Sequence, residues 1–568
     1  MLPMLLMAGI LFLTGSIFLY FRIDRSEALD QYDVLSFCES IPVPVFSVPE
    51  GIYDQPFELE ISAPSEYDIY FTTDGSTPTT RSRRYQKRIH VDPKINLNPN
   101  ILYISSSITW RFPYGRQNHC TVFRARCFKT GVGYGAVKNM IYNSTDITQH
   151  QGFHIIHLLM EPDSLFSPTK GIYVVGEKYY SKKALAANEQ LPDFQEWFGY
   201  PANFYMRGRK WRRPAAFILM NLSGETLFEQ NITVNVRGVS TRALPEKSLR
   251  IMPDSPNDTV IRYPLFDELP YSSYKNAILK NSGHDFKATM LRDVLIHRLA
   301  DGTRVDHHTY APSVVYINGN YWGIHHVTVK LDENYLVAKY ASSLPNITII
   351  DYNAYRTTEQ LTMLYGDKTS VATFKQLLDF IHENSLVNDD TYRAVCTQID
   401  VDNFIDYVIL ETFFANWDWP IHNVRIYRFD QQTEFMIQQG IDAGKWRWWF
   451  FDLDGGMETT SSINMFETIR NEFAQDVVTQ IFFSFMENED FKEKFIARCE
   501  YLLKNHLSSE KMLEEINSLE AKCLDEMKRH IARWRNLGNI QLWQKNVEKI
   551  KKFAEERPAN VLEQLKSL

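Results

Sequence analysis

Cysteine is scarce in this chain, with six residues in 568. Such a low count excludes a disulfide-built scaffold. Because no Cys-x-x-Cys pair occurs, a zinc ribbon or a thioredoxin-type site is disfavoured as well. Positive charge is not in excess, since 61 Lys and Arg stand against 69 Asp and Glu, a net charge of −8. This balance excludes a nucleic-acid binder that works through a broad basic surface.

Sequence repeats and low-complexity tracts are also absent. Apolar residues make up 44% and charged residues 23%, which is typical of folded domains and excludes wholesale disorder. The length predicts three or four structural units, at roughly 100–200 residues each. Aromatic residues are the abundant class at 14%, and they predict extensive hydrophobic cores.

A long uncharged run stands at the N-terminus, from Leu2 to Phe21. As a helix at about 1.5 Å per residue it is long enough to cross a bilayer. No Lys or Arg precedes it and no Ala-x-Ala-like site follows it, so an uncleaved anchor is favoured over a signal peptide or a buried core helix. We expect residues 1–22 to be a transmembrane anchor or signal segment, and residues 23–45 to be a linker.

Residues 46–145 have the pattern of an all-β module. Alternating or aromatic-rich stretches at 57–61, 67–73 and 121–128 predict short strands. The cluster Asp74-Gly75-Ser76-Thr77-Pro78 predicts a turn, because Asp74 can accept backbone hydrogen bonds and Gly75 permits positive φ. Short strands separated by turns predict a β-sandwich. Cys120 and Cys127 fall in this module, and they either pair in an oxidising compartment or remain ordinary thiols.

This module resembles the C-terminal β-sandwich of chitobiases and β-hexosaminidases. The matching stretches are Phe46-Ser47, Gly51-Ile52-Tyr53, Tyr70 to Pro78, Tyr85 and Phe123-Arg124-Ala125-Arg126-Cys127. The resemblance raises a sugar-binding role for the module. The other interpretation is that the turn residues only build the turn.

From residue 152 to 568 the pattern changes to mixed α and β. A helix is predicted at 404–414, and helices broken near Gly538 and Pro558 are predicted after Asp490. Strands are predicted at 154–159, at 215–220 and 232–237 joined as a hairpin, at 314–324 with Asn-Gly at its turn, and at 445–451.

Two loops in this region carry residues suited to phosphoryl transfer. In Asn416 to Asn423, Asp418 precedes Asn423 by five positions, and a later strand ends in Asp452-Leu453-Asp454-Gly455. Phosphoryl transfer needs a carboxylate to orient the attacking hydroxyl, and amide and carboxylate oxygens to hold Mg²⁺. The Asp-x₄-Asn spacing and a later strand-end Asp follow the layout of protein kinases. The Gly-rich loop and the Val-Ala-Ile-Lys lysine are both absent, so this is no ordinary kinase.

The region 152–568 resembles the CotH kinase family, the atypical protein kinases of spore coats and bacterial envelopes. Besides the two Asp loops, the matching blocks are Gly171-Ile172-Tyr173-Val174, Trp211-Arg212-Arg213-Pro214, Val236 to Arg242, Lys247-Ser248-Leu249-Arg250-Ile251, Met290-Leu291-Arg292-Asp293, Tyr316-Ile317-Asn318-Gly319, Tyr321-Trp322-Gly323 and Arg557-Pro558. The resemblance implies ATP-dependent phosphorylation of protein Ser/Thr, with ATP and Mg²⁺ or Mn²⁺ as cofactors.

The family's roles carry over by position. Asp418 takes the catalytic Asp, Asn423 and Asp452 take the metal ligands, and Asp454 is a second candidate ligand. Lys247 is the candidate for the ATP-phosphate lysine. Arg237 and Arg242 are candidate helpers in the same cofactor-binding role. For these three cations, the alternative is a purely structural pairing.

One stretch departs from the family pattern. Relatives often carry Gly-x-Tyr-x-x-x-Glu after the Asn-Gly hairpin, and here His325 replaces the Tyr and Val329 the Glu. If that Glu pairs the lysine, this chain is weakened or inactive. His325 and His326 are adjacent on a strand and point to opposite faces, so one shared metal ion is disfavoured. The aromatic run Trp446 to Phe451 is interpreted as strand packing rather than as a sugar platform.

Together these features predict an α+β protein in which an atypical protein-kinase-like domain follows a β-sandwich and an N-terminal helix. The predicted function is an envelope kinase that phosphorylates surface or coat proteins; the alternative is a non-catalytic, pseudokinase-like binding or scaffold protein. The predicted location is extracytoplasmic and membrane-anchored through residues 2–21, or secreted if that segment is cleaved. Cell-wall or carbohydrate contact is an open partner prediction, and nucleic acid is excluded.

Overall fold

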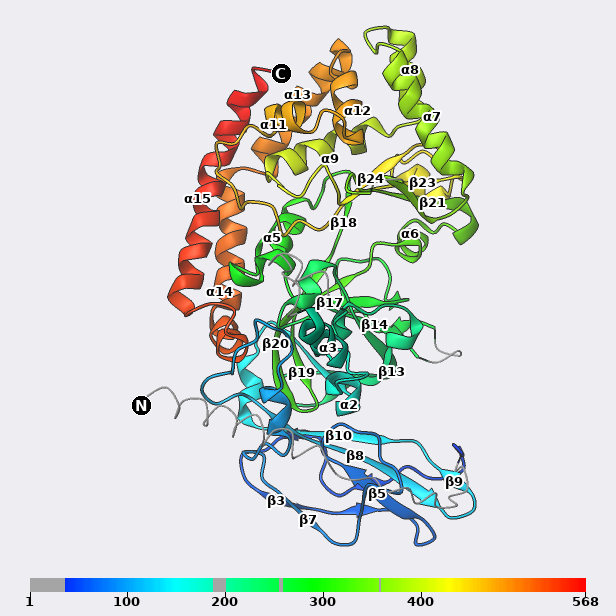
Figure 1. Ribbon diagram of the computed structural model, residues 1–568, viewed down its shortest axis with the longest axis vertical. Coiled ribbons are helices and arrows are strands. Elements are labelled where there is room, and N and C mark those ends of the chain that lie inside the picture. The colour runs from blue at the N-terminus through cyan, green and yellow to red at the C-terminus, as the bar shows by residue number, and fades with distance from the viewer. Residues whose placement is uncertain (1–35, 187–200, 255–258, 357–358) are drawn as a thin grey trace.

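The computed structural model describes residues 36–186, 201–254, 259–356 and 359–568. The predicted anchor at 1–22 lies outside these residues, as does most of the predicted linker. Within the described ranges, no helix combines the length and the apolar character needed to cross a membrane. The chain is an α+β protein with a β-rich N-terminal module and a larger mixed region (Figure 1).

The N-terminal module is a sandwich of short strands. Its main sheet runs in the order β2-β10-β8-β5-β6, with β9 paired to β8, and the pairs β1–β4 and β3–β7 complete the fold. Strands β3, β5, β8 and β10 fill a separate core with Leu59, Phe71, Phe123 and Tyr142. The bounds are β1 Val45–Phe46, β2 Gly51–Ile52, β3 Phe57–Leu59, β4 Ile61–Ser62, β5 Asp68–Thr72, β6 Arg83–Arg84, β7 Ile89–Val91, β8 Cys120–Lys129, β9 Gly133–Tyr134 and β10 Lys138–Asn143, with 3₁₀ helices η1 Pro99–Tyr103 and η2 Thr145–Gln149.

The predicted turn after β5 fastens the sandwich to the larger region. Asp74 Oδ1 accepts hydrogen bonds from Ser76 N at 2.9 Å and Ser76 Oγ at 2.6 Å, and Gly75 has φ +86°. A Cβ on Gly75 would lie 2.2 Å from Asn318 Cγ, so only glycine fits against this hairpin residue. Thr77 N donates to Glu161 Oε1 at 2.6 Å. These contacts support the interpretation of the motif as a structural turn, and they give it a docking role.

Seven strands of the larger region close into a barrel in the order β11-β12-β13-β14-β17-β20-β19. The predicted hairpins are confirmed as β12–β13 and β19–β20, and Asn318 and Gly319 take φ +49° and +79° at the second turn. The bounds are β11 His154–Leu159, β12 Arg213–Met220, β13 Thr226–Val236, β14 Leu249–Pro253, β15 Ile261–Arg262, β16 Ser273–Tyr274, β17 Ala277–Lys280, β19 Tyr310–Ile317 and β20 Asn320–Val329, with α2 Pro162–Phe166, α3 Glu177–Ala186, α5 Arg292–Leu299 and 3₁₀ helices η3 Asn203–Tyr205, η4 Arg209–Trp211, η5 Ser240–Ala243 and η6 Gly283–Lys287.

The C-terminal part holds a second sheet, β18-β24-β23-β21-β22, surrounded by helices (Figure 1). Helix α9 begins where Asp400 caps Asn403 N, and it is buried along its whole length from Asn403 onward. The bounds are β18 Asp306–His307, α6 Glu333–Tyr340, η7 Leu344–Asn346, β21 Ile347–Tyr352, β22 Leu361–Tyr365, α7 Thr369–Glu383, α8 Asp389–Cys396, α9 Val401–Phe413, β23 Val424–Phe429, α10 Glu434–Gln438, β24 Arg447–Phe450, α11 Met465–Glu472, α12 Val477–Phe485, α13 Glu489–Asn505, α14 Ser509–Trp534 and α15 Ile540–Leu565.

Helices α14 and α15 run along both halves and hold them together (Figure 1). Trp534 Nε1 of α14 donates to Trp322 O on the barrel at 2.6 Å. Arg557 of α15 is buried and donates to Thr412 O and Phe413 O at the end of α9. Helix α14 is therefore tied to the barrel, and α15 is tied to the end of α9, which leads into the Asp418 loop.

One local prediction is corrected, and one alternative that the sequence left open is decided. The helix break predicted at Pro558 is wrong, because α15 continues through it to Leu565, held by the buried Arg557 and Val561 on either side. Cys120 and Cys127 are both free thiols. They stand seven positions apart on the single strand β8, which at about 3.3 Å per residue is far beyond disulfide reach.

Candidate functional site

Asp418 and Asn423 lie on the loop between α9 and β23, and they contact each other. Asn423 Nδ2 donates to Asp418 Oδ2 at 2.9 Å, and His422 Nε2 lies 2.8 Å from the same oxygen. Because the amide nitrogen of Asn423 is used in this way, its amide oxygen is the atom left for a cation. Asn423 has φ +59°, an uncommon conformation for a residue other than glycine and one that often marks functional sites. The Asp-x₄-Asn loop therefore brings these two side chains into direct contact.

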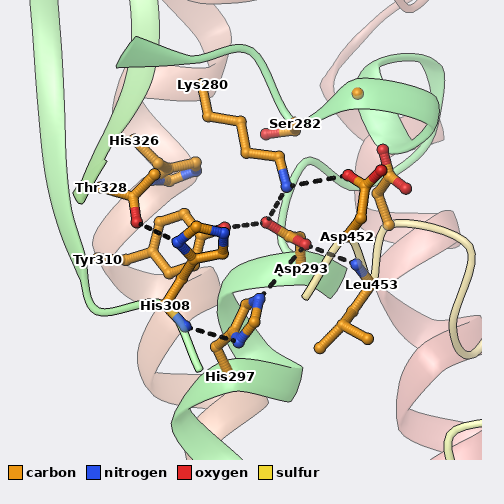
Figure 2. A network of polar contacts seen from close by, with 12 residues as sticks. Lys280, Ser282, Asp293, His297, His308, Tyr310, His326, Thr328, Asp452 and Leu453 are labelled. Atoms are coloured by element: carbon orange, nitrogen blue, oxygen red, sulfur yellow. Dashed lines mark hydrogen bonds and ion pairs between the residues drawn. The ribbon is translucent and has the colours of Figure 1, made fainter. Parts of the chain in front are cut away.

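Lys280, which the sequence analysis did not select, is the lysine at the second Asp loop. Its Nζ lies 2.7 Å from Asp293 Oδ2 and 3.6 Å from Asp452 Oδ1 (Figure 2). Lys280 comes from barrel strand β17, Asp293 from helix α5, and Asp452 from the loop after β24. The lysine therefore bridges the two halves of the larger region.

Asp293 also holds the backbone of the Asp452 loop. Leu453 N donates to Asp293 Oδ1 at 2.9 Å, and the Tyr310 hydroxyl donates to Asp293 Oδ2 (Figure 2). Burial would raise the pKa of Asp293, but the charge of Lys280 lowers it well below its usual range. Burial likewise opposes the charge of Lys280, and Asp293 and Asp452 keep its pKa well above the ordinary value. The pair is therefore fully charged at neutral pH.

The structure corrects the assignment of Lys247 and Arg242. Lys247 is fully buried and its Nζ donates to Arg242 O at 2.8 Å and Leu244 O at 2.9 Å. Burial lowers its pKa well below the ordinary value. Arg242 donates to the backbone oxygens of Gly238, Phe204 and Met206. Both cations brace the loop between β13 and β14, so neither side chain is free to reach a phosphate.

Val329 lies on the other face of the barrel wall from Lys280. It pairs with Ala277 and is 3% exposed, whereas Lys280 pairs with His326. Since successive strand residues face opposite sides, an acid at position 329 would point away from Lys280. The carboxylate partner of the lysine comes from α5 instead, so the departure at Val329 leaves the ion pair intact. His325 and His326 do face opposite sides, toward Lys247 O and Met290 O respectively.

Comparison with known families gives two matches. The family model described as CotH kinase protein matches residues 234–561, more than half of the chain. The chain belongs to the CotH kinase family. Membership points to atypical protein-kinase-like activity, for which ATP and a divalent metal are general requirements. The chitobiase/β-hexosaminidase C-terminal domain model matches residues 48–98 in the sandwich, and no curated protein matches the chain.

The CotH aspartates offer oxygen donors suited to a hard cation. Asp452 has φ +62° and a 46% exposed side chain, while Asp454 is buried and accepts a hydrogen bond from His284 N at 2.7 Å. Burial, followed by the charge of Asp452, raises the pKa of Asp454 well above its usual value. No cluster of three or more His, Cys, Asp or Glu ligands occurs among the described residues. Mg²⁺ seldom needs one, because it binds through one or two carboxylates plus substrate phosphates. The donors present therefore fit it.

Glu411 of α9 is hydrogen-bonded to the loop that carries Asp418. It is fully buried, and its Oε2 accepts a hydrogen bond from Asn416 Nδ2 at 3.0 Å. Burial raises the pKa of Glu411 from 4.5 to about 8, and the charges of Asp418 and Asp452 add to the effect. At neutral pH the neutral acid therefore adds no further negative charge near Asp418 and Asp452.

This pKa predicts a pH-dependent stability. Between pH 4.5 and about 8 the folded state keeps the Glu411 proton that the unfolded chain has lost. The free energy of unfolding therefore falls as pH rises through this window, by on the order of 5 kcal/mol in total. Glu411→Gln keeps an acceptor for Asn416 and removes the titration. In urea unfolding at several pH values, the advantage of this variant over wild type should grow from pH 5 to pH 8. The exposed control Glu472→Gln should show none, and a pH-independent difference for Glu411→Gln would contradict the assignment.

Proposed function

We propose that this protein is an atypical protein kinase of the cell envelope. It transfers the γ-phosphate of ATP to Ser or Thr of surface or coat proteins, with Mg²⁺ or Mn²⁺ as the metal. The observation that carries the proposal is Lys280, placed between Asp293 and Asp452. This lysine–carboxylate pair beside a metal-type Asp is the arrangement that protein kinases require. The Asp418–Asn423 loop supplies the remaining two roles.

In this reaction Asp418 orients the acceptor hydroxyl and takes its proton. The acceptor oxygen forms a bond to the γ-phosphorus as the bond from that phosphorus to the β-phosphate oxygen breaks, leaving ADP. Lys280 neutralises developing charge on the phosphate oxygens, and Asp293 keeps its ammonium in place. Asn423 and Asp452, with Asp454 behind them, would hold the cation. When bound, the cation supplies further neutralisation of phosphate charge.

The setting of the reaction is part of the proposal. An uncharged run over residues 2–21 would tether the kinase at a membrane, with the sandwich and kinase domain outside the cytoplasm, or free if the run is cleaved. A protein acceptor in the envelope or coat is the proposed substrate. The chitobiase-like match supports a cell-wall or carbohydrate contact of the sandwich through a surface other than the docked Gly75 side.

Nucleotide binding tests this function against a non-catalytic scaffold role. For the full chain, Mg²⁺-ATP at about 100 times its Kd should add about 2.7 kcal/mol to the free energy of unfolding, and the melting temperature should rise. Labelled phosphate from ATP should also enter proteins of an envelope extract. A flat thermal response with both Mg²⁺ and Mn²⁺ would favour the scaffold. Binding without incorporation would mark a pseudokinase.

A further inference from the structure

A fully buried polar cluster lies where helix α14 meets the barrel. Glu246, in the segment before β14, stands between His325 of β20 and His530 of α14. Its Oε1 is 3.4 Å from His325 Nδ1, and its Oε2 is 3.8 Å from His530 Nε2. All three side chains are completely buried. These three residues, called the Glu246 cluster below, cross the same joint as the hydrogen bond from Trp534 to Trp322 O.

The facing atoms of the Glu246 cluster have no hydrogen-bond partner. Among the described residues, none is found for either carboxyl oxygen of Glu246, for His325 Nδ1 or for His530 Nε2. Buried polar atoms in native proteins are seldom left unpaired, so four of them at one place call for an explanation. The protonation of the three groups supplies one.

The surroundings keep all three groups neutral. Burial raises the pKa of Glu246 well above its ordinary value, and it lowers the pKa of His325 to about 4 and that of His530 to about 3. The Arg533 guanidinium, stacked on the rings of Trp322 and Trp534, further opposes a positive charge on His530. The other titratable groups that face the cluster from the packed elements are Tyr173 between α2 and α3, Lys247 next to Glu246, His326 of β20 and Glu526 of α14.

The outer contacts of the two neutral rings fix where their protons lie. His325 Nε2 is 3.3 Å from Lys247 O, which can only accept, so Nε2 carries the proton and Nδ1 the lone pair. Ile324 N donates to His530 Nδ1 at 3.1 Å, so here Nε2 carries the proton. A protonated Glu246 is complementary to both rings, since it can donate toward His325 and accept from His530. A metal ion fits poorly, because His530 Nε2 has no lone pair to offer it.

We propose that the Glu246 cluster is a pH-sensitive contact between α14 and the barrel, which opens when its two histidines take up protons. The proposal goes beyond phosphoryl transfer and does not depend on it, because none of the three residues belongs to the proposed transfer site. A histidine charged in the closed contact would face the neutral acid of Glu246 and find no counter-charge there.

The direction of the pH effect follows from the two kinds of group. Opening brings the rings into water, where a histidine titrates near pH 6.5. Since burial lowers their pKa values to about 4 and about 3, the open form binds more protons below pH 6.5 and is favoured as pH falls. Glu246 has the opposite dependence, because in the open form it loses its proton above its ordinary pKa of 4.5. The two effects balance at about pH 6.5, so acid below this value weakens the contact.

Hydrogen exchange of the full chain, corrected for the pH dependence of free amides, tests the contact. From pH 6.5 to pH 5, opening of α14 and β20 should increase about tenfold in wild type, while strand β8 of the sandwich stays protected. His530→Asn keeps an acceptor for Ile324 N and cannot take up a proton, so its opening should not increase. Glu246→Gln can still donate to His325 and accept from His530. It lacks the opposing titration, so its opening should increase by about 200-fold. The exposed control His90→Asn should behave as wild type.

The remaining outcomes would overturn the proposal. Equal acid responses of wild type, His530→Asn and Glu246→Gln would show that the cluster does not control the joint. An increase spread equally over α14, β20 and β8 would mean global unfolding instead of a local opening. If Zn²⁺ abolished the acid response of wild type, the cluster would be a metal site. Should His530→Asn not fold at pH 6.5, Glu246→Gln still decides the question. No nucleotide is used, so none of these results bears on the kinase proposal.

Discussion

Asp452→Asn should lower labelled-phosphate incorporation by about 10³-fold or more while the fold survives. The change removes the exposed carboxylate that faces Lys280 and would hold the cation, and losses of this size are typical when charge stabilisation of the transferring group is removed. Asparagine has the same shape and tolerates the left-handed conformation that Asp452 adopts at φ +62°. The melting temperature should therefore stay within a few degrees of wild type.

A matched surface variant shows whether activity is lost because of the position of the carboxylate or because the protein has one negative charge fewer. Asp430→Asn removes a carboxylate that pairs with Arg428 at the end of β23, away from the two Asp loops, and should leave incorporation unchanged. Incorporation by Asp452→Asn at the wild-type rate would remove the kinase assignment. If activity and stability fell together, Asp418→Asn would decide the matter, because Asp418 is held by its own loop and its loss should affect transfer alone.

The positions of the two Asp loops could be predicted from sequence because each motif is local. Asp418 and Asn423 are five positions apart on one loop, and Asp452 closes a strand whose aromatic run was rightly interpreted as packing. Trp446, Trp448 and Trp449 are all buried. Short-range spacing places such residues whatever the rest of the chain does. The sandwich turn at Asp74 and the Asn318 hairpin were predictable for the same reason, since turn chemistry is local.

Lys280 could not be found in this way. Its partner Asp293 lies on a different element, and their meeting depends on how α5 packs against the barrel. Lys247 and Lys280 both lie on or beside apolar strands of the barrel, and only the tertiary structure shows that one faces loop carbonyls and the other Asp293 and Asp452. The block Met290 to Asp293 resembles the family pattern, and it was the sequence feature that could have pointed to Asp293. The orientation of Val329 away from Lys280 could not be predicted for the same reason, because it is set by the pairing of Val329 with Ala277.

Removing the amine of Lys280 should abolish most phosphate transfer, whereas removing that of Lys247 should lower stability and leave transfer in place. Lys280→Met should reduce incorporation by about 10²-fold or more, because it removes the cation that faces the phosphates. It also leaves Asp293 as a buried acid without its main partner, which costs about 3–5 kcal/mol and threatens the fold. The double variant Lys280→Met/Asp293→Asn removes both charges. It should recover much of the stability while remaining inactive, which ties the loss to chemistry.

Lys247→Met provides the comparison. It removes an amine that donates to two loop carbonyls, so it should cost about 1–3 kcal/mol in stability while the folded protein still transfers phosphate. Urea unfolding and incorporation per folded molecule, measured on all three variants, give the two quantities separately. Recovery of activity in the double variant would show that Lys280 serves only to neutralise Asp293. Loss of ATP binding by a folded Lys247→Met protein would return the phosphate role to Lys247 and remove it from Lys280.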